Sequence, residues 1–209
     1  LEHGISHAST LEDTGTSQYM ALAWLVGDDE RQLDLPQRDD ESASSPMSDD
    51  EIDAEETLFQ RYALAVLWYQ TTDLRIVQQS LTSSDIENPF DEEVDPLSFT
   101  AGDIKWKNDN NWMSGKGMCT WHGITCHSNP LNIDTDTDLS GDDYDYHVAI
   151  LNITSNNVHG TLPREVYTAF GKLKALDVSR NGFAGSLANE VGMLSDLQDL
   201  FVFENNFSG

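Results

Sequence analysis

The chain has 209 residues, with 37 acidic and 11 basic side chains and a net charge of −26 at pH 7. This excess excludes binding to a nucleic acid backbone or to anionic lipid by charge attraction. The acids are concentrated early, because residues 1–103 hold 24 of them with 4 bases, whereas residues 148–209 hold 6 acids and 4 bases.

The sequence contains no candidate transmembrane segment or signal peptide. Its longest apolar run, Tyr62 to Tyr69, has eight residues, against the roughly 20 that span a bilayer. The chain begins with Leu, without the basic and then apolar pattern of a secretory signal. We expect a fragment of a longer protein, so these absences say nothing about the parent.

Residues 1–52 are predicted to form an acidic, largely disordered leader. A short helix is expected near residues 18–26, with Ser17 as its cap. Residues 27–52 are rich in Asp, Glu, Ser, Gln and Pro and poor in apolar residues, a composition typical of a solvated linker. An interaction tail is the alternative.

Residues 53–147 form a second region. A helix is predicted over 53–72, because apolar residues recur there at helical spacing and acids occupy its first turn. Residues 73–103 are acidic and are expected to be an insertion. Residues 104–126 contain a W-x-x-x-x-x-W pattern and the octet C-T-W-H-G-I-T-C, and residues 127–147 form an acidic loop.

Alternating carboxylates in this loop resemble the start of a calcium-binding EF-hand loop. Asp134, Asp136 and Asp138 occupy its first three ligand positions. Leu139 stands where Gly is needed, and Asp145 stands where the bidentate Glu should be. We favour a solvated acidic loop and keep a weak calcium site as the alternative.

Residues 148–209 repeat a pattern of the form L-x-x-L-x-L-x-x-N-x-F-x-G. The copies span 148–172, 173–196 and 197–209, the last one incomplete. Starts 25 and 24 residues apart fall in the period range of leucine-rich repeats. The alternating apolar residues predict short strands, and the aligned Asn and Gly residues predict a ladder of amide hydrogen bonds and a sharp bend. The fold class is therefore α/β, a solenoid of stacked coils with short parallel strands on its concave face.

The motif N-x-F-x-G-x-L resembles the plant-type class of leucine-rich repeat. That class occurs in receptor-like kinases, receptor-like proteins and polygalacturonase inhibitors. Ala188 replaces the Pro expected in the second copy, and the first copy has one extra residue. Two segments resemble the N-terminal cap of diatom leucine-rich-repeat proteins. They are Q-R-Y-A-L-A-V-L-W-Y at residues 60–69 and Y-x-A-L-x-W-L at residues 19–25.

The octet is similar to the cap motif of the plant-type class, in which the two cysteines form a disulfide. The resemblance implies that Cys119 and Cys126 pair and that the chain is extracellular or on a cell surface. A redox pair and half of a zinc site are the competing interpretations. A redox pair usually has two residues between its cysteines, and a zinc ion needs four ligands.

Two triplets match the acceptor sequence for N-linked glycans, at Asn152 and at Asn206. Asn206 is the favoured site, because a glycan at Asn152 would obstruct binding on the strands. Catalysis finds no support: no His stands beside a Ser or Cys nucleophile in a known motif, and phosphate-loop, kinase and zinc-protease motifs are absent. We expect no enzyme activity and no cofactor in this chain.

The concave face is the predicted binding surface, because strand side chains that do not enter the core project from it. Phe201 and Phe203, flanked by acids, are typical of a recognition surface; packing against an adjacent coil is the alternative. The candidate ligand-binding residues are Asn152, Lys174, Asp177, Arg180, Asp199, Phe201, Phe203 and Glu204.

The resemblance implies the ectodomain of a receptor-like cell-surface protein that binds a protein, peptide or glycan and no nucleic acid. A secreted inhibitor of the polygalacturonase-inhibitor type is one alternative. The sensor part of a receptor-like serine/threonine kinase, with its kinase domain elsewhere, is another.

Overall fold

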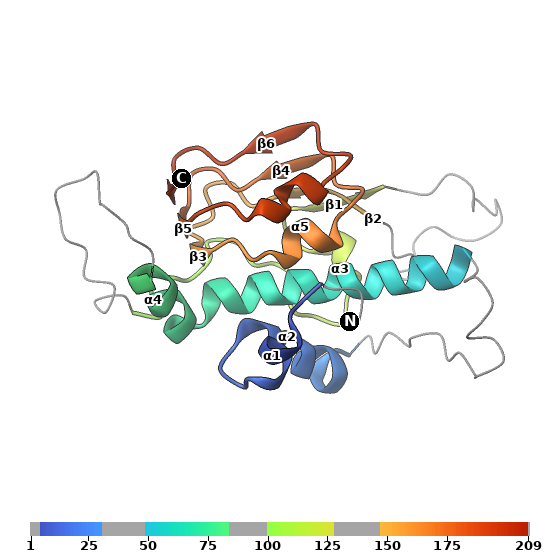
Figure 1. Cartoon of the computed structure of the whole chain (residues 1–209), viewed down its shortest axis with the longest axis horizontal. Coiled ribbons are helices and arrows are strands. Elements are labelled where there is room, and N and C mark those ends of the chain that lie inside the picture. The colour runs from blue at the N-terminus through green and yellow to red at the C-terminus, as the bar shows by residue number, and fades with distance from the viewer. Residues whose placement is uncertain (1–4, 31–48, 84–99, 128–146, 209) are drawn as a thin grey trace.

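The computed structural model describes residues 5–30, 49–83, 100–127 and 147–208, without the side chains of 49–53 and 80–83. The protein is a mixed helix-and-strand structure with one disulfide. A long helix, α3 (Asp49–Thr72), crosses the molecule with the leader helices on one side and the strands on the other (Figure 1). Calcium candidates Asp134, Asp136 and Asp138 lie outside the described residues.

Helix α3 is the centre of the cap, because it is covered on both sides. Every residue from Tyr62 to Leu67 is fully buried. Helix α2 packs against it from the leader, and α5, β2 and β3 pack against it from the repeats. The predicted helix 53–72 ends where α3 ends, but α3 begins four residues earlier, where further acids favour its N-terminus.

A second helix, α4 (Leu74–Ser83), lies within the segment expected to be an acidic insertion. Asp73 caps it, since its Oδ1 accepts hydrogen bonds from the backbone N–H of Arg75 at 2.9 Å and of Ile76 at 3.4 Å. Val77 is fully buried. The remainder of the insertion, residues 84–99, lies outside the described residues.

The described part of the leader includes the helix expected near residues 18–26 and one helix more than predicted. It contains α1 (Ala8–Glu12), α2 (Ser17–Ala23) and one π-helical turn (Trp24–Asp28). Thr16, and not Ser17, caps α2 by accepting the N–H of Tyr19 at 3.1 Å. Ser17 is buried and donates to Gln70 of α3 at 2.8 Å. The leader therefore packs on the cap, and the linker composition belongs mainly to residues 31–48, outside the described residues.

Residues 100–127 are the part of the cap that meets the repeats. A 3₁₀ turn (Met118–Thr120) precedes strand β1 (Ile124–His127), and the disulfide between Cys119 and Cys126 spans them with its Cα atoms 5.5 Å apart. This confirms the pairing implied by the resemblance. Strand β1 pairs antiparallel with β2 (His147–Asn152), the first strand of the repeats.

Each repeat contributes one strand to each of two sheets. Strands β2, β4 (Ala175–Asp177) and β6 (Asp199–Phe201) are parallel and extend the sheet in the order β1-β2-β4-β6. A second parallel sheet contains β3 (His159–Thr161), β5 (Gly182–Gly185) and β7 (Asn206–Phe207). Helix α5 (Glu165–Ala169) and a 3₁₀ turn (Asn189–Met193) follow in successive copies.

The aligned asparagines form the expected ladder. Oδ1 of Asn181 accepts the N–H of Asn156 at 2.9 Å, and its Nδ2 donates to the carbonyl of Ile153 at 2.8 Å. One copy further along, Nδ2 of Asn205 donates to the carbonyl of Val178 at 2.9 Å and its Oδ1 accepts the N–H of Phe183 at 3.0 Å. Asn156 extends the ladder into the cap, because its Oδ1 accepts the N–H of Asn108 at 2.7 Å. The cap therefore occupies the place of a preceding coil.

The expected bend is present at the two described glycines of the pattern. Gly160 and Gly185 have φ values of 105° and 76°, in the region that favours glycine. The residue before each ladder Asn is also left-handed: Ser155, Arg180 and Glu204 have φ values of 55°, 56° and 54°. Recurrence at the same place in each copy makes this turn part of the repeat.

Candidate functional site

The strand register aligns residues of successive copies on the side of the strands away from the core, and we call this surface the strand face. Asn152 pairs with Asp177, which pairs in turn with Phe201. The core residues between them, such as Leu176 and Val178, are fully buried. The aligned sets are Ile150, Ala175 and Asp199; Asn152, Asp177 and Phe201; Thr154, Ser179 and Phe203; and Ser155, Arg180 and Glu204.

Seven of the eight predicted ligand-binding residues belong to these sets, and Lys174 immediately precedes β4. Six side chains are exposed and two, Lys174 and Asp177, are half-buried. The exposed six are Asn152, Arg180, Asp199, Phe201, Phe203 and Glu204. The structure thus brings the candidates onto one surface.

In the first two copies the strand face is polar and internally hydrogen-bonded. Asn152 Oδ1 accepts the N–H of Thr154 at 3.1 Å, and Asp177 Oδ1 accepts the N–H of Ser179 at 3.0 Å. The buried Ser179 hydroxyl also donates to Asp177 at 2.6 Å and lies 2.9 Å from Thr154 Oγ1. Asn152 and Asp177 therefore support the turn after their strands.

In the third copy, aromatic side chains stand in place of these polar groups. We define the aromatic patch as Phe201, Phe203 and Glu204 of this copy together with Arg180 of the second. The Phe201 and Phe203 side chains are 42 % and 50 % exposed and meet edge to face with centroids 6.4 Å apart. The Arg180 guanidinium lies 5.7 Å from the Phe203 centroid and pairs with Glu204 at 3.2 Å. Both rings stay substantially exposed beside these charges.

A tryptophan array fills the cap beneath the repeats. All five tryptophans of the chain take part, and successive ring centroids lie 4.8 to 6.2 Å apart. The array runs through Trp24, Trp121, Trp112, Trp106 and Trp68. It joins the leader, α3 and the disulfide segment into one core.

Arg61 anchors the leader to this array. Its side chain is 1 % exposed, and its guanidinium lies 5.1 Å from the Trp24 centroid and 4.9 Å from the Trp121 centroid. Two nitrogens donate to the carboxylate of Asp29 at 2.5 and 2.7 Å. Further hydrogen bonds reach the carbonyls of Ser114 and Lys116. The charge is thus fully paired, which suits a structural role.

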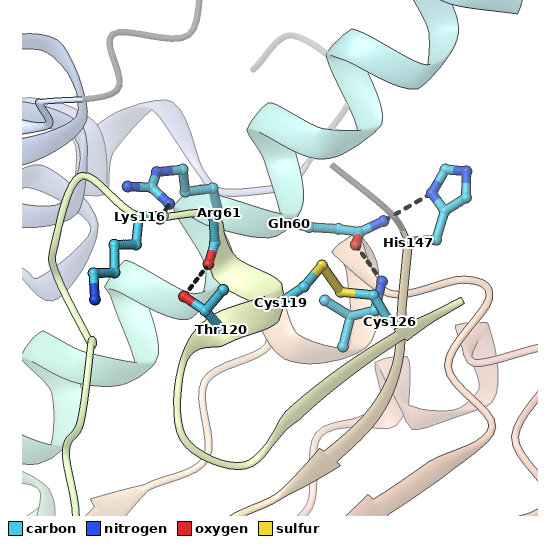
Figure 2. Close-up of a disulfide and its surroundings, with 9 residues drawn as sticks. Gln60, Arg61, Lys116, Cys119, Thr120, Cys126 and His147 are labelled. Carbon is cyan, nitrogen blue, oxygen red and sulfur yellow. Dashed lines mark hydrogen bonds between the residues drawn. A yellow bond between two sulfur atoms is a disulfide. The ribbon is translucent and has the colours of Figure 1, made fainter. Parts of the chain in front are cut away.

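The preceding residue, Gln60, connects α3 to the first repeat strand. Its Oε1 accepts the backbone N–H of Val148 at 2.8 Å, and its Nε2 lies 3.3 Å from Nδ1 of His147. Figure 2 shows Gln60 reaching this strand beside the disulfide while Arg61 turns toward Lys116. Consecutive polar residues of α3 therefore connect the helix to two separate parts of the chain.

A second buried polar group holds the leader to α5. Glu165 is 1 % exposed and accepts hydrogen bonds from Ser6 at 2.5 Å and from Gln18 at 3.2 Å. Ser6 Oγ also lies 2.9 Å from the Tyr62 hydroxyl. Burial, with the nearby Glu165 carboxylate, raises the pKa of Tyr62 well above its ordinary value, so the phenol stays protonated.

These groups do not resemble a catalytic site. Within the described ranges, no three His, Cys, Asp or Glu side chains are grouped so as to hold a metal ion. No helix in that part of the chain is long and apolar enough to cross a membrane. The buried ion pair between Arg61 and Asp29 was not predicted from the sequence. Its one sequence signal is the position of Arg61 directly before the apolar run of α3.

Comparisons with known proteins find similarity over part of the chain. No family model matches. A stretch of 100 residues, 47 % of this chain, is 26 % identical to a probable inactive receptor kinase of Arabidopsis thaliana and spans 13 % of that protein. Among solved structures, the leucine-rich-repeat ectodomain of the receptor kinase SOBIR1 from Arabidopsis thaliana is 22 % identical, with a TM-score of 0.35.

The solved ectodomain matches 44 % of this chain and 46 % of its own length. The chain therefore spans a small part of the curated relative and under half of the solved structure. The likeness of the cap to diatom proteins stays a prediction. The sequence match confirms that part of this chain resembles a plant receptor kinase.

Proposed function

We propose that this chain is a non-catalytic recognition region of a receptor-like, cell-surface protein, and that its repeats stack as a solenoid. The ligand, a protein, peptide or glycan, binds on the strand face. The match to a receptor kinase supports the receptor-like role, and fold resemblance alone would not give the function. The disulfide supports an oxidising, extracellular location.

The aromatic patch is the observation that carries this proposal. Phe201 belongs to β6 and Phe203 follows it closely, so parallel pairing and the asparagine ladder hold both in a fixed backbone. A preorganised backbone lowers the entropy lost on binding. Large exposed aromatics bordered by charges, here Arg180 and Glu204, are the composition that interface centres favour.

The two polar copies complete the proposed surface. Asn152 and Asp177 each use one oxygen to support a turn, which leaves other polar atoms for a ligand. Asp199 is exposed at the start of β6. Such groups add specificity at the rim of an interface, whereas exposed charge pairs contribute only about 0–1 kcal/mol.

The test is a binding measurement on the complete chain. Peptides selected from a random display library against the wild-type chain are measured by calorimetry against the double variant Phe201→Ala with Phe203→Ala. The matched control is Val26→Ala, which truncates a leader side chain that is 74 % exposed. We expect at least about a tenfold loss of affinity in the double variant, as for truncated interface aromatics, and none in the control.

Thermal unfolding of the same variants separates recognition from packing. If the patch recognises ligand, the melting temperature of the double variant matches that of the wild type. Unchanged peptide affinity would reject the patch as the binding site. A marked drop in melting temperature would instead place the two rings in the core.

A further inference from the structure

Strand β7 presents an acceptor triplet for N-linked glycans in an open, extended segment. Asn206 and Ser208 are exposed, whereas Phe207 between them is half-buried. The Phe207 ring stacks on Phe183 with centroids 6.0 Å apart and planes 5° apart. The alternation of the strand therefore points the acceptor Asn and its hydroxyl partner outward together.

The Asn206 side chain is not committed to the fold. Among the described residues no hydrogen bond involves its amide, whereas the adjacent Asn205 donates to the carbonyls of Val178 and Val202 at 2.9 and 3.1 Å. Asn157, the equivalent residue of the first copy, donates to two carbonyls of the cap. A sugar on Asn206 therefore displaces no structural hydrogen bond.

The position also leaves the strand face open. Asn206 belongs to the sheet β3-β5-β7, whereas the aromatic patch begins on β6 of the other sheet. The other acceptor triplet, at Asn152, lies on the strand face, because Asn152 pairs with Asp177. The hydroxyl of Thr154 in this triplet is hydrogen-bonded to Ser179.

We propose that Asn206 carries an N-linked glycan. The inference rests on the proposed passage of the protein through the secretory pathway. In the transfer, Asn206 Nδ2 forms a bond to the anomeric carbon of a lipid-linked oligosaccharide. The lipid pyrophosphate leaves from that carbon, and the amide loses one proton. No oxidant or reductant is needed.

The sequence makes the modification simple to locate. Trypsin cleaves after Arg180, and no Lys or Arg follows it, so residues 181–209 form one peptide with Asn206 in its only acceptor triplet. Asn152 lies in a different tryptic peptide, residues 117–164. Occupancy of the two sites is therefore measured separately.

The experiment uses the complete chain behind a cleavable signal peptide, with a glycan-free domain fused after residue 209, secreted from eukaryotic cells. A Lys placed directly after residue 209 ends the tryptic peptide there, and treatment with peptide N-glycosidase should convert Asn206 to Asp in this peptide, which starts at Asn181. Asn206→Gln and Ser208→Ala should each abolish this conversion, and Asn152→Gln should leave it unchanged. Secreted chain with an unmodified Asn206 overturns the proposal.

This outcome is independent of the proposed ligand binding. Glycan occupancy is measured by peptide mass, whereas ligand binding is measured with the Phe201 and Phe203 variants. We expect Asn206→Gln to bind selected peptides as tightly as wild type, because its side chain lies outside the patch. A glycan found on Asn152 alone also contradicts the assignment.

Discussion

Arg61 and Asp29 form an ion pair across 32 residues of sequence, and their side chains are 1 % and 0 % exposed. The pair fixes the described part of the leader against α3 and against the segment before the disulfide. Because a buried charge without its partner is costly, this contact makes the leader part of the folded cap.

The first prediction concerns this pair. Arg61→Ala should lower the free energy of unfolding by about 3–5 kcal/mol, because it leaves Asp29 buried and unpaired. Denaturation by urea measures the change. The control is Arg75→Ala, which removes an ion pair to Asp73 whose Arg is 74 % exposed, and it should change stability far less because solvent screens the pair. Equal losses in both variants would contradict a buried anchor.

The second prediction concerns the disulfide. Closing this short loop should stabilise the fold by about 2.5 kcal/mol through the entropy of the unfolded chain. Reductant should lower the melting temperature of the wild type and leave that of the Cys119→Ser, Cys126→Ser double variant unchanged. A wild-type melting temperature insensitive to complete reduction would refute a stabilising role.

The third prediction concerns the asparagine ladder. Asn181→Ala removes the acceptor for the N–H groups of Asn156 and Val158 and a donor to Ile153, at a cost of about 1–3 kcal/mol for each buried group left unpaired. Asn205→Ala should cost less, because Asn205 is in the outermost described copy. Chemical denaturation compares the two, and the reverse order would contradict the ladder as a stack that strengthens inward.

The fourth prediction concerns pH. Burial lowers the pKa of His159 below its ordinary 6.5, although the Asn157 carbonyl and Asp103 act in the opposite direction. Because the unfolded state then binds more protons, stability from neutral His159 is complete above pH 6.5 and is lost as pH falls toward the folded pKa. The stability difference between wild type and His159→Gln, measured by denaturation, should shrink from pH 7.5 to pH 5. A stability difference that stays constant between pH 7.5 and pH 5 would contradict a stabilising role for neutral His159.

The repeats were predictable because their period is local. Leu151, Leu176 and Leu200 recur at nearly constant spacing, and this spacing alone gave the parallel register and the strand face. The asparagine ladder was predictable from the same alignment. Its extension to Asn108 was not, because Asn108 lies outside the periodic pattern.

The leader and α4 were harder to predict, because their stability comes from distant contacts. Trp24 and Asp29 are buried by partners far along the chain, whereas the sequence predicted only a short helix around Trp24 and a solvated linker from residue 27 onward. For α4, the local signal was Asp73 before an apolar stretch, and the surrounding acids obscured it. The turn-supporting roles of Asn152 and Asp177 depend on side-chain conformations that spacing does not determine.

The tryptophan array divides the molecule into two spectroscopic regions. All five tryptophans lie before residue 128, and residues 148–208 contain none. Intrinsic tryptophan emission therefore reports the leader and cap, whereas circular dichroism reports helices and strands throughout. Coincident transitions by the two methods would show that cap and repeats unfold as one cooperative unit. If the tryptophan emission changes at a higher denaturant concentration than the circular dichroism signal, the repeats unfold first while the cap stays folded.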